Sequence, residues 1–462
     1  MSSLLSRFVR MMMLTLVLGL AVARPAAAAD EGPSILRDTE SEQLFNDIAT
    51  PLVEAANLDK KSVKVILIKD DSINAFVAGS QDVYVHSGLI LAADNVNEVQ
   101  AVIAHELGHV AGGHSIRLAN GAKQATGITL ATLVLGAIAI AAGAGEAGMG
   151  LMSLGQQAAL GSFLAFTRAQ ETSADLAGAS YLSKAGISGK GSLQFFKKLQ
   201  NQEFRLAIYA TDSYDRTHPL SSERISILEY LYKKDPAWNN PIDPKLEASF
   251  ERVKAKLAGF INPRDAIRKY PESDQTVPGH YARAYAYHLG AYPDKALSEA
   301  DALLKTNPQD PYFLELKGQI LLEGGKPAEA VAPLREAVQQ SHDAPLIAAM
   351  LGHALIATEK VENFGEAKTI LKIAVARDNQ NPFAWYQLGM IYSQEGDPAR
   401  AALATAERNN LEGNPKLALA SAEMAMRGIP AGSPDYLRAQ DIAMVSKIEL
   451  KKDKKGRGRD DD

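Results

Sequence analysis

The 462-residue sequence predicts an α+β unit, mostly helical with a small sheet, followed by an all-α solenoid. Two observations predict this division. Short apolar segments between residues 63 and 86 have the pattern of strands, and long runs with helical periodicity follow them. Beyond residue 276, small residues recur with a period close to 34, which is typical of stacked helix pairs.

The N-terminus has the layout of a cleavable secretory signal. Arg7 and Arg10 precede an apolar core over 11–23, and small residues follow it before a predicted cleavage between Ala29 and Asp30. The core is short for a membrane span. We therefore expect export and a periplasmic location.

Composition narrows the classes of partner and of chemistry. The chain has 49 basic residues, 54 acidic residues, no cysteine and a formal net charge of −5. The charged residues of the predicted signal are all basic, so its loss would make the net charge more negative. The acidic balance disfavours nucleic acid as a partner, and the absence of cysteine excludes disulfides and a cysteine nucleophile.

After the signal we expect a helix and then three short strands, at 36–57, 63–69, 73–78 and 82–86. A mostly buried helix follows the sheet directly, with Asn97 as its predicted N-cap and Gln100 three residues later. The small sheet packed against helices defines the α+β unit.

This buried helix carries the sequence His105-Glu106-Leu107-Gly108-His109. Residues four apart lie on one helix face, so His105 and His109 can bind one metal ion. Glu106 lies beside the first histidine and reaches a water on the metal rather than the metal itself, as a general base does. The alternative is a chance occurrence on a polar helix face. The pattern favours a zinc peptidase.

A catalytic zinc usually has three protein ligands, so a third is sought downstream. His114 is one candidate, but the long motif with a third histidine requires it at Ser115. If the helix continues, His114 points away from the other two. The better candidate is Glu171, because Asp175 lies one helical turn later and can accept the N–H of a ligand histidine.

These motifs, together with Thr217-His218-Pro219 and Arg224-Ile225, resemble the gluzincin-type zinc endopeptidases, the family of HtpX and the CAAX prenyl proteases. The similarity is greatest to periplasmic members with a tetratricopeptide tail. It covers about residues 35–230, and the tail more loosely. It implies one Zn²⁺ ion per chain.

The resemblance also implies residue roles. His105, His109 and Glu171 would bind zinc, Glu106 would be the catalytic base, and Asp175 and Arg224 would contact the ligands. His218 would stabilise the oxyanion or occupy the open zinc position in a resting state. Finally, the resemblance implies that Asn74, Ala75 and Phe76 form an edge strand on which a substrate backbone pairs.

An apolar stretch rich in alanine and glycine over 125–145, and a second over 149–166, separate the two zinc motifs. A buried or mobile helical hairpin is the favoured interpretation. Contact of 125–166 with a membrane surface or a membrane-protein substrate is the second, and a true span is the third.

The C-terminal half has the tetratricopeptide pattern. Ala284, Gly318 and Gly352 are spaced by 34 residues, and a three-residue insertion falls between Gly352 and Ala367, around 359–363. The predicted units are a signal peptide, a zinc metallopeptidase domain, a linker with a connecting helix, a repeat domain and a disordered charged tail, at 1–29, 30–234, 235–275, 276–450 and 451–462.

Two functions remain as hypotheses. The first is an endopeptidase that degrades misfolded or stalled envelope proteins, with the repeats recruiting substrate or outer-membrane assembly machinery. The second is a chaperone or scaffold for outer-membrane protein assembly, with latent or rare proteolysis.

Overall fold

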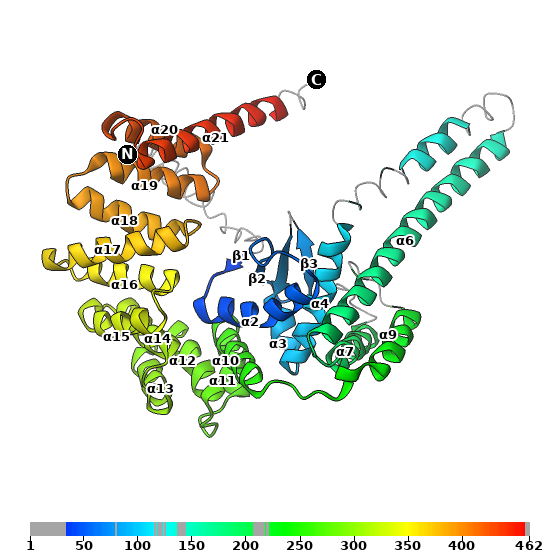
Figure 1. Ribbon diagram of the computed structural model, residues 1–462, viewed down its shortest axis with the longest axis horizontal. Coiled ribbons are helices and arrows are strands. Elements are labelled where there is room, and N and C mark those ends of the chain that lie inside the picture. The colour runs from blue at the N-terminus through cyan, green and yellow to red at the C-terminus, as the bar shows by residue number, and fades with distance from the viewer. Residues whose placement is uncertain are drawn as a thin grey trace, which may run out of the picture.

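A computed structural model describes residues 34–78, 81–114, 117, 123, 126–135, 145–206, 218 and 221–457. An N-terminal unit holds a small sheet and several helices, and an array of helix pairs curves beside it (Figure 1). The predicted fold classes, α+β and then all-α, are confirmed. The predicted signal over 1–29 lies outside the described residues.

The sheet has four strands in the order β1 (Ser34–Leu36), β2 (Val65–Lys69), β4 (Asp82–His86) and β3 (Ala75–Ala78). β2 and β4 are parallel, whereas β1 and β3 are antiparallel to their neighbours. β3 therefore forms one edge. The alternating pattern predicts β2, β3 and β4 but not β1, because three residues are too few to form a pattern.

Helix α2 (Thr39–Ala55) confirms the predicted helix over 36–57, but it begins at Thr39. It starts there because the Asp38 side chain accepts a hydrogen bond from the backbone N–H of Ser41 at 2.8 Å. A short helix, α3 (Ser87–Ala92), follows β4. The expectation that the zinc-motif helix follows the sheet directly is therefore wrong.

The zinc-motif helix is α4 (Val96–Gly112), and Asn95 caps it by accepting from the backbone N–H of Glu98 at 3.2 Å. The predicted cap, Asn97, is wrong by two residues, because Asn95 and Glu98 already have the spacing of a capping box. Asn97 instead donates to the carbonyl of Ser188 at 2.8 Å and so joins α4 to the residues just before helix α7 (Lys190–Leu206). Most of α4 is buried.

The 40-residue helix α6 (Gly145–Lys184) and a helical segment at 126–135 project from the N-terminal unit (Figure 1). They pack closely, since a Cβ at Gly155 would lie 1.9 Å from Oγ1 of Thr132. The two helical segments of the predicted hairpin are thus present, but most of their described large apolar side chains are exposed, not buried. The exposed ones are Leu130, Leu133, Val134, Leu135, Met149, Leu154, Leu160 and Leu164. None of the described helices has both the length and the apolarity needed to cross a membrane.

Among the described residues, five further helices lie between α6 and the array. They are α7 (Lys190–Leu206), α9 (Ser222–Lys234), the 3-10 helix η1 (Pro236–Asn239), α10 (Pro244–Ile261) and α11 (Pro263–Lys269). The predicted linker contains η1, and α10 packs against both α2 and the first helix of the array.

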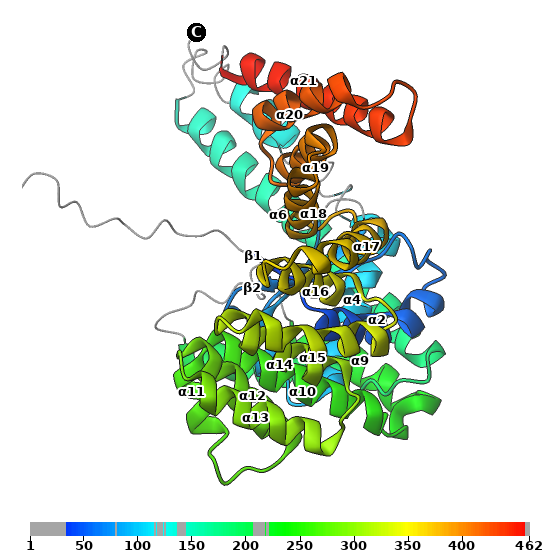
Figure 2. The ribbon, with the colours of Figure 1, turned by 90° about the vertical axis from the view of Figure 1, so that its left-hand side faces the viewer.

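Figure 2 shows the helix pairs of the array stacked from α12 to α21. Their bounds are α12 (Val277–Leu289), α13 (Pro293–Thr306), α14 (Pro311–Glu323), α15 (Pro327–Gln340), α16 (Pro345–Ala357), α17 (Val361–Arg377), α18 (Pro382–Gln394), α19 (Pro398–Leu411), α20 (Pro415–Gly428) and α21 (Pro434–Arg457). α21 extends to Arg457 and so includes residues 451–457 of the predicted charged tail; residues 458–462 lie outside the described part.

The repeat pattern has a structural cause in close helix packing. A Cβ at Gly318 would lie 2.4 Å from Cγ of Leu334, and one at Gly352 would lie 2.5 Å from Cγ of Leu371. The predicted insertion adds a turn at the start of α17, which has 17 residues where α15 and α19 have 14.

A buried network of charges joins the array to the N-terminal unit. Arg252 on α10 pairs with Glu40 on α2 and with Asp310 before α14, at 2.8 Å each. Tyr281 on α12 donates its hydroxyl to Glu40 at 2.5 Å, and Lys256 on α10 pairs with Asp38. These contacts fix the first repeats against α2 and α10.

Candidate metal centre

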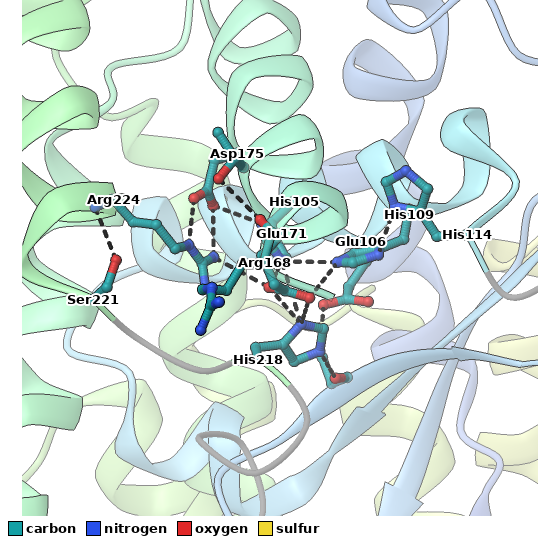
Figure 3. Close-up of polar contacts among 12 residues, drawn as sticks. His105, Glu106, His109, His114, Arg168, Glu171, Asp175, His218, Ser221 and Arg224 are labelled. Atoms are coloured by element: carbon teal, nitrogen blue, oxygen red, sulfur yellow. Dashed lines mark hydrogen bonds and ion pairs between the residues drawn. The ribbon is translucent and has the colours of Figure 1, made fainter. Parts of the chain in front are cut away.

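Three segments that are distant in the sequence meet in the N-terminal unit: α4, α6 and the residue at 218 (Figure 3). Ring nitrogens of His105, His109 and His218 and a carboxylate oxygen of Glu171 all lie within 4.8 Å of one another, and all four residues are buried. The structure therefore brings together the three predicted metal ligands and the additional predicted histidine.

Small residues let α4 and α6 approach closely enough for these side chains to meet. A Cβ at Gly108 would lie 2.6 Å from the carbonyl oxygen of Ala174, and one at Gly178 would lie 3.1 Å from the backbone of Ala104. The glycine inside the histidine motif thus has a packing role. It places one turn of α4 against the turn of α6 that carries Glu171.

The two motif histidines direct the same atom toward Glu171. Nε2 of His105 and Nε2 of His109 are 3.1 Å apart, and they lie 3.4 Å from Oε2 and Oε1 of Glu171 respectively. Nδ1 of His105 lies 3.0 Å from Oδ1 of Asp175 on the next turn of α6. Asp175 therefore contacts a candidate ligand through the nitrogen that faces away from the cluster, as the spacing predicts.

Arg224, in the first turn of α9, contacts the carboxylates of both Glu171 and Asp175 on α6. Its Nε and a terminal nitrogen donate to Asp175 at 2.6 and 2.9 Å, and that terminal nitrogen lies 3.2 Å from Glu171. A planar guanidinium makes such paired contacts with a carboxylate, and Lys cannot. Arg224 thus lies beside the candidate ligands, outside the cluster itself.

Burial and neighbouring charges set the pKa values of the cluster. Burial alone lowers the pKa of His105, but the adjacent carboxylates of Asp175 and Glu171 outweigh it and raise the pKa to about 10. Burial, reinforced by the charge of His105, lowers the pKa of His109 to about 2. Although burial opposes it, contact with His105 and His218 lowers the pKa of Glu171, which stays ionised.

Glu106 lies next to the cluster without belonging to it. Its side chain is fully buried, and neither carboxylate oxygen has a hydrogen-bond partner among the described residues. Burial raises the pKa of this carboxyl group, and the nearest cation candidate, Nε2 of His218, is 3.5 Å away. A buried carboxylate without a partner is costly unless another group occupies the space beside it.

His218 links the cluster to the edge strand. Its Nδ1 lies 3.2 Å from both oxygens of Glu171 and 3.4 Å from Nε2 of His105, and its Nε2 lies 3.3 Å from the carbonyl oxygen of Ala75 on β3. Of the other predicted strand residues, Asn74 is buried and Phe76 stacks on Tyr84 of β4. Ala75 and Phe76 thus belong to the edge strand β3 and Asn74 directly precedes it, and the contact with the cluster is made by the carbonyl of Ala75.

His114 lies where simple helix geometry does not predict it. If α4 continued past residue 113, His114 would point away from His109. In the structure the Nδ1 atoms of His109 and His114 are 3.0 Å apart. The helix ends at Gly112, and the next residue, Gly113, has a left-handed φ of 59°, which turns the chain so that His114 lies beside His109. The Gly112-Gly113 pair is the sequence signal for this, because glycine favours such a helix end.

The donor set fits a divalent metal. Two imidazole nitrogens and a carboxylate oxygen are the ligands that Zn²⁺ takes in catalytic sites, where a fourth position stays open. The pair of Nε2 atoms and the ionised Glu171 offer these donors, and the unpartnered Glu106 lies beside them. His218 adds a third nitrogen, and so a fourth donor atom, at the same place.

A buried centre of this kind, on two crossed helices beside an open sheet edge, is the arrangement of a metallopeptidase. The sequence profile of peptidase family M48 matches residues 37–232, and a tetratricopeptide-repeat profile matches residues 280–345. The chain belongs to peptidase family M48.

Three curated relatives extend this result. The β-barrel assembly-enhancing protease of Yersinia pestis is 27% identical over 407 residues, which are 86% of this chain and 81% of the relative. The protein of the same name from Escherichia coli K12 is 25% identical over 415 residues, 87% of this chain and 82% of the relative. Metalloprotease LoiP of Escherichia coli K12 is 33% identical over 192 residues, 40% of this chain and 69% of the relative.

Proposed function

We propose that this protein is a zinc-dependent endopeptidase of the HExxH gluzincin type. His105, His109 and Glu171 are the proposed ligands of one zinc ion per chain. The observation that carries the proposal is the convergence of the histidine Nε2 atoms with the carboxylate of a second helix, within 4.8 Å. Membership in a metallopeptidase family supports it.

When bound, Zn²⁺ lowers the pKa of a water molecule to about 7 and polarises the scissile carbonyl group. Glu106 is the proposed general base, and its raised pKa suits it to accept the proton of the attacking water. It then delivers this proton to the leaving amine. No covalent intermediate is needed, and the chain contains no cysteine that could form one.

The substrate backbone is proposed to pair with Asn74, Ala75 and Phe76 as an added strand. Two observations support this. β3 is an edge strand, and the carbonyl of Ala75 lies 3.3 Å from His218, so this strand borders the cluster. An extended peptide on β3 would therefore pass beside Glu106.

His218 has two proposed roles, to stabilise the oxyanion or to occupy the open zinc position in a resting state. Its Nδ1 lies 3.2 Å from Glu171 and 3.4 Å from His105, among the donor atoms themselves. This favours the resting-state role. A histidine there would have to move before a substrate carbonyl could enter.

Misfolded or stalled envelope proteins are the proposed substrates, in the periplasm. The two relatives that align over most of this chain are named β-barrel assembly-enhancing proteases, and these names support a role in the assembly of outer-membrane proteins. The repeat array is proposed to recruit substrate or the assembly machinery, because such arrays bind proteins on their curved surface. The acidic net charge of −5 still disfavours nucleic acid.

A second candidate function is a chaperone or scaffold for outer-membrane protein assembly. The observation that favours it is His218 among the donor atoms, which would keep hydrolysis latent. In this case the repeat array would carry the main activity. The two candidates differ in whether Glu106 is needed.

The experiment compares the purified wild type with Glu106→Gln and His218→Ala, using a denatured outer-membrane β-barrel protein as substrate. Wild type should cleave it slowly, His218→Ala faster, and Glu106→Gln not at all while keeping its zinc. In a strain lacking the gene, the wild type should then restore envelope integrity and Glu106→Gln should not. Equal rescue by Glu106→Gln would favour the scaffold.

A further inference from the structure

The two candidate histidine ligands have different partners on their outer nitrogens. Nδ1 of His105 faces the carboxylate of Asp175 at 3.0 Å, whereas Nδ1 of His109 faces another imidazole, Nδ1 of His114, at 3.0 Å. The rings of His109 and His114 are nearly perpendicular, at 81°, with centroids 4.9 Å apart. His114 is only 6% exposed, so this is an interior contact.

The local sequence makes room for this contact in two ways. Gly113 ends α4 in the left-handed conformation and turns the chain back. Gly112 leaves the space that the ring fills, since a Cβ there would lie 2.3 Å from Nε2 of His114. Any larger residue at 112 would push the ring away from His109.

His114 does not itself belong to the cluster of donor atoms, which consists of His105, His109, Glu171 and His218. Figure 3 shows its ring on the side of His109 that is turned away from His218. Its contact is with Nδ1 of His109, while Nε2 of His109 faces Glu171 at 3.4 Å. His114 can thus act on a metal only through His109.

The contact specifies a proton position. Two ring nitrogens 3.0 Å apart share one N–H, and the other nitrogen accepts it. If His109 binds metal through Nε2, the lone pair must be on Nε2 and the proton on Nδ1, so His109 donates to His114. The opposite tautomer would point an N–H at the metal.

We propose that His114 is a positioning residue that fixes His109 in the Nδ1–H tautomer and orients its Nε2 toward the metal. This inference rests on the proposed zinc function. Because the partner is a neutral ring and not a carboxylate, His109 is oriented without adding a second negative charge to the one that Asp175 contributes. Asp175 is thus the one carboxylate that contacts the Nδ1 atom of a candidate histidine ligand among the described residues.

The test uses two variants of equal size, His114→Leu and His114→Asn, in the full-length protein. Asn offers an oxygen near the position of Nδ1, and Leu offers no acceptor. Zinc dissociation constants come from competition with a chromophoric chelator, and the urea midpoint of the metal-free protein reports folding. We expect His114→Leu to weaken zinc binding about 10–100-fold and His114→Asn to stay within about threefold of the wild type.

A third variant, Gly112→Ala, keeps the test independent of folding defects caused by substitution of His114 itself. Gly112→Ala should displace the His114 ring and weaken zinc binding in the wild-type background, but not in His114→Asn, whose shorter side chain avoids the 2.3 Å approach. Equal zinc affinity in His114→Leu and His114→Asn, whether both normal or both weak, would overturn the inference. A wild type that binds no zinc would instead contradict the proposed function.

Discussion

Gly108 on α4 lies against the backbone of Ala174 on α6, where an added Cβ would come within 2.6 Å of the carbonyl oxygen. This contact sets the distance between the helices that carry the candidate ligands. Gly108→Ala should therefore separate α4 from α6, lower the zinc content and destabilise the protein by about 1–3 kcal/mol. Elemental analysis and urea unfolding measure the two effects.

Gly161→Ala, on α6, the helix against which Gly108 packs, is the matched control, because a Cβ at Gly161 meets no atom within 4 Å. It should leave zinc binding unchanged and, if anything, raise stability by up to about 1 kcal/mol, since alanine is the better helix former. Similar behaviour of the two alanine variants would contradict the role of Gly108.

Arg224 is a cation that compensates the carboxylates of Glu171 and Asp175 on α6. Arg224→Met would leave Asp175 and Glu171 buried with one partner fewer, and we expect a loss of about 3–5 kcal/mol in unfolding free energy. Zinc affinity should fall as well, because Asp175 would no longer be held against His105. Arg224→Lys should rescue little, since an ammonium group cannot donate two parallel hydrogen bonds. Full stability of Arg224→Met would refute this account.

Glu315 on α14 predicts a pH dependence that originates far from the metal centre. Burial, together with the charges of Asp38 and Glu40, outweighs the attraction of Lys256 and raises its pKa to about 8. The folded state thus holds this proton more tightly than the unfolded state, whose pKa is near 4.5. The stabilisation is complete below that value and is lost as the pH rises through about 8.

Glu315→Gln removes this dependence and should be more stable than the wild type at high pH, by up to about 5 kcal/mol, since each pKa unit of the shift is worth about 1.4 kcal/mol. The gain should be small at pH 5 and grow to a plateau above pH 8. Urea unfolding at three pH values measures it. A difference between the two proteins that does not change with pH would contradict the raised pKa.

The exposed apolar side chains of the projecting hairpin predict contact with a membrane surface. Leu130, Leu154 and Leu160 are 58%, 64% and 59% exposed. Replacing all three by serine should abolish flotation with lipid vesicles, yet change the unfolding free energy by no more than about 0.5 kcal/mol each, because little contact is lost.

Val361, Leu417 and Leu437 provide the comparison, since they are similarly exposed on the repeat array, at 77%, 56% and 50%. Their serine variants should float like the wild type. If the wild type fails to float, the hairpin has another partner or none, and the membrane interpretation is wrong.

Regular local patterns explain what could be predicted from the sequence. His105 and His109 follow from helical spacing, and Glu171 follows from its place one turn before Asp175. The repeat array, with the extra turn of α17, follows from its period. These features depend on residues close together in the chain.

Tertiary or very short features were harder to predict. His218 lies 113 residues from His105, and only resemblance to known enzymes pointed to it. The position of His114 depends on where α4 ends. Helical spacing predicts this position only for a helix that continues, whereas α4 ends before the left-handed Gly113. The strand β1 and the helix α3 have three and six residues, too few to show a period.

Metal content of the purified full-length protein tests the central claim most directly. Elemental analysis should find about one zinc ion per chain in the wild type, a content that Glu106→Gln retains and that His105→Ala and Glu171→Ala lose. A wild type without metal, or full zinc retention in Glu171→Ala, would contradict the proposed ligand set.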